Sequence, residues 1–98
     1  MAKVRFQNKK NYPGLLKMSV VNTSSEILAS FAFQETIISD YYDIPAGEHI
    51  PKYNEYHNCL PESGTYNFKE GRKYTVVGDV VGVLPIELVF NVTDDGPF

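Results

Sequence analysis

The sequence predicts a single all-β domain over residues 1–98, built as a sandwich of seven or eight short antiparallel strands. Apolar residues alternate with period two along most of the chain, while helical periodicity is almost absent. Clusters of turn-forming residues recur at a spacing of roughly ten residues. The length of 98 residues, of which 43% are hydrophobic, is typical of one globular domain. A small closed barrel is the second choice, because strand alternation is the same in both architectures.

The amino-terminal third of the chain predicts a short strand followed by a hairpin. The first strand covers residues 4–6, and a loop with Asn, Pro and Gly follows at 8–14. Alternating runs at 16–21 and 27–33 enclose the polar cluster 22–25. Short polar side chains bond back to the local backbone and favour a turn, so these two runs predict a β-hairpin.

The middle of the chain predicts two further strands. Residues 36–44 form the first, which Pro45 and Gly47 end, because Pro lacks an amide donor and Gly permits positive φ. Residues 48–56 form a less regular strand. Pro51 lies within it, which predicts an edge position or a bulge there.

The carboxyl-terminal part contains the remaining predicted elements. In chain order these are a loop at 58–64, a strand at 65–68, a turn at 69–72, a strand at 73–81, a last strand at 86–92 and a polar tail at 94–97. Gly78 interrupts a β-branched run and therefore predicts a bulge or a close approach of another backbone.

Composition disfavours several classes of protein. The net charge is −3, and the densest basic run is Lys9-Lys10, so we expect no nucleic-acid partner. No run approaches roughly 18 apolar residues, so we expect no membrane insertion. The single cysteine, Cys59, excludes an internal disulfide. The amino terminus lacks an apolar signal region, which predicts the cytoplasm for a full reading frame and the cell envelope or exterior if an export signal was removed.

Only one group of residues offers metal or nucleophile chemistry. His49, His57 and Cys59 combine imidazole and thiol ligands within a short stretch. A closed zinc site needs further ligands, and no CxxC or HxxxH pair supplies them. Cys59 lies in a Pro-flanked loop rather than at a helix N-terminus that would activate it. We therefore expect no catalytic residue, cofactor or metal, with a small metal-binding or Cys-dependent enzyme using these three residues as an alternative.

Tyrosines gather in the central part of the chain: Tyr41, Tyr42, Tyr53, Tyr56, Tyr66 and Tyr74. Most of these rings belong to the core or its rim on the simpler interpretation, and the adjacent pair Tyr41 and Tyr42 points to opposite faces. An exposed tyrosine offers a rigid contact area with a polar tip, which suits recognition. The irregular segment 49–60 therefore predicts a contact region, formed by His49, Tyr53, Tyr56 and His57.

Two short motifs stand out beside the alternation. One is the turn Ile44-Pro45-Ala46-Gly47, and the other is the strand Gly71-Arg72-Lys73-Tyr74-Thr75-Val76-Val77-Gly78. With the opening Val4-Arg5-Phe6-Gln7-Asn8, they make the chain resemble a family of bacterial cell-envelope domains of unknown function. That resemblance implies an immunoglobulin-like or transthyretin-like sandwich without assigned catalytic residues.

These observations together predict a non-enzymatic binding or interaction module. A sandwich presents loops at its ends and a sheet edge to which a partner strand can add, and the expected partner is a protein or a carbohydrate. A loop-presenting domain of the protease-inhibitor kind is a further alternative, because it would use an exposed loop in the same way.

Overall fold

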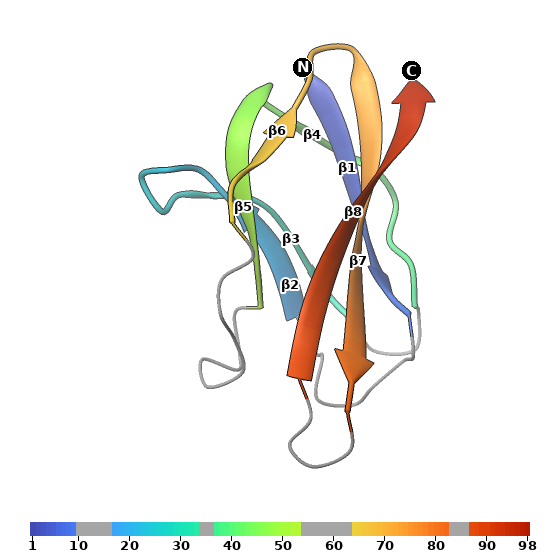
Figure 1. The fold of residues 1–98 in the computed structure, drawn as a ribbon. Coiled ribbons are helices and arrows are strands. Elements are labelled where there is room, and N and C mark those ends of the chain that lie inside the picture. Colours follow the sequence, from blue (N-terminus) through green and yellow to red (C-terminus); the bar gives the residue numbers. More distant parts are fainter. Residues whose placement is uncertain (10–16, 34–36, 54–63, 83–86) are drawn as a thin grey trace.

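The computed structural model describes residues 1–9, 17–33, 37–53, 64–82 and 87–98 (Figure 1). These residues form strands and connecting segments without a helix, and the strands belong to two separate four-stranded sheets. The all-β prediction is therefore confirmed. The two sheets enclose the core between them and do not close into a barrel, so the arrangement is sandwich-like.

The first sheet has the order β4-β1-β7-β8. Its strands are β1 (Ala2–Asn8), β4 (Tyr42–Ile44), β7 (Arg72–Val81) and β8 (Glu87–Pro97). β1 and β7 pair in parallel, in a register that runs from Lys3 opposite Lys73 to Asn8 opposite Gly78. The prediction of antiparallel strands throughout is wrong for this pair. Period-two alternation is the same in both pairings, so the sequence pattern contains no sign of strand direction.

The second sheet has the order β3-β2-β5-β6 and is antiparallel throughout. Its strands are β2 (Lys17–Val21), β3 (Ile27–Ala32), β5 (Gly47–Tyr53) and β6 (Tyr66–Phe68). The predicted β2–β3 hairpin is confirmed. Asn22 organises its turn, because its side-chain oxygen accepts hydrogen bonds of 2.9 Å from the amides of Ser24 and Glu26.

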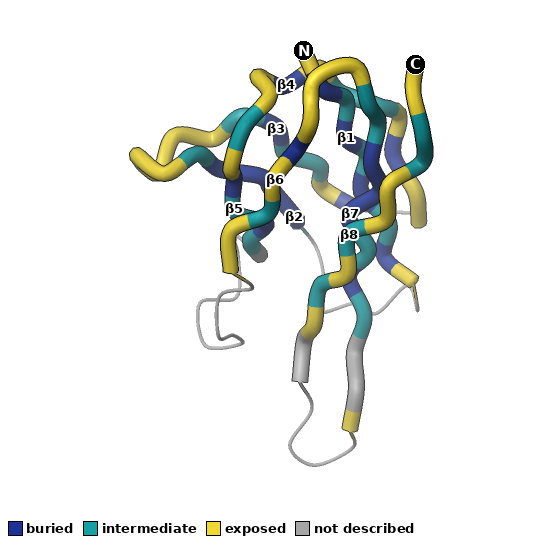
Figure 2. The backbone as a smooth tube through the Cα atoms, turned by 45° about the horizontal axis from the view of Figure 1, so that its top comes forward, coloured by how far each residue is buried: buried dark blue, intermediate teal, exposed yellow. Residues whose placement is uncertain are grey.

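The core lies between the sheets and follows the predicted alternation (Figure 2). In β1 every second side chain is buried, including Val4 and Phe6. Phe68 and Tyr74 join them from opposite sheets and meet edge to face, with ring centroids 5.1 Å apart. Aromatic pairs in this geometry stabilise a core beyond their buried area, which suits a small domain without a disulfide.

The segment before β4 differs from the predicted strand at 36–44. Of its described residues, 37–44, only Tyr42–Ile44 form a strand, and Ile38 makes an isolated bridge to Gln7. The side chain of Ser39 takes part in the pairing at this point, since its hydroxyl accepts a 2.9 Å hydrogen bond from the Phe6 amide. The Ser39 amide in turn donates to the Phe6 carbonyl at 2.8 Å. Side-chain bonding of this kind replaces a regular ladder.

The carboxyl end differs from the prediction in the opposite sense. Residues 94–97, predicted as a polar tail, belong to β8 and pair with the start of β7. The register shifts between Lys73 and Tyr74, so the bulge lies there, whereas Gly78 stays in regular register with Phe90. The bulge predicted at Gly78 is therefore not found there, and the alternative, a close approach of another backbone, stays a prediction. Gly96 has a φ of 101°, a conformation that favours glycine, and lies beside this shift.

The edge position or bulge predicted at Pro51 is met only in that the ladder on one side stops before it. β5 lies inside its sheet, where Pro51 pairs with Val20 of β2. The ladder between β5 and β6 covers only Gly47 to His49, so within the described residues β5 continues beyond β6 at Pro51. A proline is compatible with a sheet where the ladder on one side has ended.

Candidate functional site

His49 is the one fully described member of the predicted contact region, and it is only 7% exposed. Its ring stacks on Phe68 with centroids 5.9 Å apart, and its Nε2 donates to the Pro45 carbonyl at 2.7 Å. Its Nδ1 is buried and has no hydrogen-bond partner among the described residues. His49 thus packs against the core and ties the turn before β5 to the sheet.

The other predicted contact residues are not brought together with His49. Tyr53 is the last residue of β5, opposite Met18, and its side chain lies outside the description. Tyr56, His57 and Cys59 lie outside the described residues as well. Within the described part of the chain, no three His, Cys, Asp or Glu side chains lie close enough together to hold a metal ion. The contact region around 49–60 and the His49, His57 and Cys59 alternative both stay predictions.

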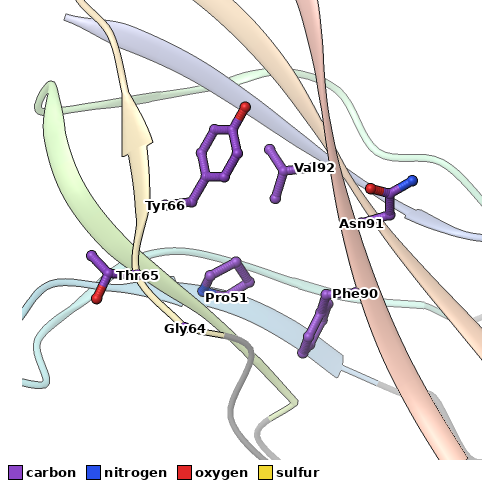
Figure 3. A pocket seen from close by; sticks show the side chains of 7 residues that line it. All are labelled: Pro51, Gly64, Thr65, Tyr66, Phe90, Asn91 and Val92. Carbon is purple, nitrogen blue, oxygen red and sulfur yellow. The ribbon is translucent and has the colours of Figure 1, made fainter.

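The structure shows a groove that the sequence did not indicate, between β6 and β8 (Figure 3). These two strands end the orders of their respective sheets, so the groove lies where the sandwich is open along one side. Its volume is about 310 Å³, and its lining consists of Pro51, Gly64, Thr65, Tyr66, Phe90, Asn91 and Val92. None of these side chains carries a charge at neutral pH, so the lining is electrically neutral.

The apolar lining comes from core positions that remain partly accessible. Phe90 and Val92 share one face of β8 and pack against the core cluster, yet both are only half-buried. Tyr66 reaches the same cluster from β6, with its ring 5.2 Å from Phe68 and 5.8 Å from Tyr74. The groove is therefore an extension of the core that the two outermost strands leave uncovered.

The rim of the groove is polar. In Figure 3 Thr65 and Asn91 stand at its two sides, and their side chains point away from its centre. Asn91 and Thr93, which follow Phe90 and Val92 in alternation, are exposed. Within residues 90–93 of β8, Phe90 and Val92 thus face the groove, and Asn91 and Thr93 between and after them face solvent.

A second cluster of functional groups lies on the outer face of the first sheet. One carboxylate oxygen of Asp95 accepts hydrogen bonds from the hydroxyls of Tyr41 and Thr75, while Arg5 Nε donates to Thr75 at 2.9 Å. Tyr41 lies between two cations, with its ring centre 4.7 Å from the Arg5 guanidinium carbon and 5.4 Å from Lys73 Nζ. The hydroxyls of Tyr41 and Thr75, the Asp95 carboxylate and the Arg5 guanidinium bond to one another. This cluster therefore fastens the segment before β4 to the sheet.

The electrostatics of this cluster follow from burial and from Asp95. Burial raises the pKa of the Tyr41 hydroxyl above its ordinary value, and the hydrogen bond and negative charge of Asp95 raise it further. Tyr42, the adjacent residue, packs against Phe6 in the core at a centroid distance of 6.2 Å. The two tyrosines therefore face opposite sides, as predicted.

Comparisons with protein-family models, curated proteins and solved structures give no match to this chain. The resemblance to bacterial cell-envelope domains stays a prediction for that reason. Among the described residues there is no helix that is long and apolar enough to cross a membrane. The assignment of a function therefore depends on the geometry of the groove and the strands beside it.

Proposed function

We propose that this domain is a non-enzymatic binding module whose partner occupies the groove between β6 and β8. The observation that carries the proposal is the accessibility of core-type side chains there: Tyr66, Phe90 and Val92 are all only half-buried. Apolar surface in a groove of about 310 Å³ loses contact with water when a ligand enters, which favours binding. We place the fold in the immunoglobulin-like or transthyretin-like class of bacterial envelope sandwiches as part of the same proposal.

The chemistry of the lining supports binding rather than catalysis at this groove. Pro51, Phe90 and Val92 offer neither a nucleophile nor a transferable proton. The Tyr66 hydroxyl is the only ionisable group among the lining side chains. Thr65 and Asn91 leave hydrogen-bonding groups at the solvent-exposed rim, while a ligand in the groove would be held mainly by apolar contact.

The proposal is tested by presenting the whole chain with two classes of probe, a library of displayed peptides and an array of glycans. Ligands obtained from either are then titrated while amide NMR shifts are recorded. We expect the largest shifts in β6 and in β8 from Phe90 to Thr93. Shifts confined to the segment around 49–60 would place the site in the predicted contact region instead and overturn the groove assignment.

Two neighbouring substitutions give a matched comparison. Val92→Lys places a charge in the groove, whereas Thr93→Lys places the same charge on the opposite, exposed face of β8. We expect Val92→Lys to weaken binding by at least about tenfold, which is about 1.4 kcal/mol, and Thr93→Lys to leave it unchanged. If Val92→Lys does not fold, Val92→Thr supplies a milder change. Equal effects of the Val92 and Thr93 substitutions would refute the proposed site.

A further inference from the structure

We infer that the ligand of this groove is an extended peptide that adds to β8 as a fifth strand of the β4-β1-β7-β8 sheet. This inference rests on the proposed function and specifies its partner. Three properties of β8 support it: its place in the sheet, the alternation of its side chains and the charges along it.

β8 is the last strand of its sheet in the described order, and it is the longer of the two strands that border the groove. It spans 11 residues, whereas β6 spans 3. The strand at the end of a sheet directs alternate N–H and C=O groups outward, and these groups can pair with another chain. The stretch from Asn91 to Thr93 lies directly beside the groove and is long enough to begin such a ladder.

The alternation of side chains in β8 determines what an added strand must look like. Strands in one sheet share their two faces, so every second side chain of the added strand would lie on the face of Phe90 and Val92. Those side chains would enter the groove and cover Tyr66. The intervening ones would lie beside Asn91 and Thr93 in solvent. The ligand is thus a peptide with apolar residues at alternate positions.

Charge decides between a second copy of β8 and a different segment. If β8 paired antiparallel with β8 of a second copy, centred on Asn91, Glu87 of each copy would lie opposite Asp95 of the other. If the two copies paired in parallel and in register, each aspartate would lie beside the same aspartate of the other copy. Like charges on neighbouring strands destabilise a ladder. Asp94 already pairs with Arg72, and Asp95 accepts from Tyr41 and Thr75, so this end of β8 tolerates a neutral or basic neighbour but disfavours a further carboxylate. We therefore assign the site to a neutral or basic peptide from another protein.

The test begins with selection from a library of short peptides that have apolar residues at alternate positions, using the full chain as the target. The best binder is then resynthesised as a series in which one backbone nitrogen at a time is methylated. Methylation removes a hydrogen-bond donor and leaves the side chains intact. We expect binding to fall by about tenfold or more at every second nitrogen and to change little at those between. A peptide of the same composition, with its apolar residues in one block, serves as the control.

The outcomes separate the inference from the function on which it rests. A peptide that loses affinity for the Val92→Lys variant but shows no period-two response to methylation leaves the groove in place and overturns strand addition. Selection that yields no peptide sensitive to Val92→Lys overturns strand addition as well, and groove-specific glycan binding would then still support the proposed function. Sedimentation of the ligand-free chain as a dimer that Val92→Lys dissociates would assign β8 to a second copy and refute the inference.

Discussion

Replacement of Asp95 by asparagine tests the polar cluster on the outer face of the first sheet. Asp95 is 19% exposed at its side chain, and one of its oxygens accepts hydrogen bonds from Tyr41 and Thr75. Asparagine keeps the shape and removes the charge. Hydrogen bonds to a charged group contribute about 1 kcal/mol more than neutral ones, so weakening two of them should cost about 2 kcal/mol. For a domain of this size that lowers Tm by about 8–16 °C.

The assay is urea unfolding followed by circular dichroism, together with an NMR titration of the Tyr41 ring. Because the hydrogen bond and charge of Asp95 raise the Tyr41 pKa, we expect that pKa to fall toward its ordinary value in Asp95→Asn, while burial keeps part of the shift. Asp94→Asn is the matched control, since Asp94 is more exposed and pairs with Arg72 instead. If both variants lose the same stability, or the Tyr41 pKa does not move, the cluster does not stabilise the fold as described.

Three further predictions concern the core, a turn and acid pH. Phe6→Ala should lower the free energy of unfolding by about 3–5 kcal/mol in urea denaturation, because Phe6 is fully buried; a loss under about 1 kcal/mol would contradict its central place. Asn22→Ala should cost about 0.5–1.5 kcal/mol per lost hydrogen bond in the β2–β3 turn, measured in the same way, and Asn22→Asp should retain most of the stability. The hydrogen bond from Arg72 lowers the pKa of Asp94. The stability that this ion pair contributes is therefore complete above the ordinary carboxyl pKa and is lost as the pH falls through the lowered pKa. Thermal melts of Asp94→Asn and the unmodified protein should therefore converge in acid, and parallel pH profiles would refute this.

The strands and their buried faces could be predicted from the sequence because alternation directly reports which side chains are inside. Val4 and Phe6 are buried where the period-two pattern places them. The Asn22 turn was predictable for a similar reason, since its side-chain bonding is local. The strand at 36–44 was overestimated because apolar residues of one parity, such as Ile38 and Tyr42, do not reveal that the Ser39 hydroxyl will bond a distant amide.

The groove was not predictable, because it depends on which strands end the two sheets. Phe90 and Val92 have the same alternating pattern as the core residues of β7, and only the sheet order makes them accessible. The burial of His49 was not predictable either, although its place in a contact region stays a prediction. A histidine in an irregular, tyrosine-rich segment suggested a surface contact, whereas packing on Phe68 buries its ring.

The parallel pairing of β1 with β7 has a consequence for how the chain folds during synthesis. β1 lies between β4 and β7, both of which follow it in the sequence, and its pairing with β7 joins residues such as Lys3 and Lys73. The ribosome therefore releases β1 long before either neighbour exists. Its pairing with β7 must wait until the last third of the chain emerges, and pairing over such a sequence distance is slow and leaves a nascent chain open to aggregation. Completion of the first sheet thus comes late in the synthesis of this domain, after β7 and β8 have been made.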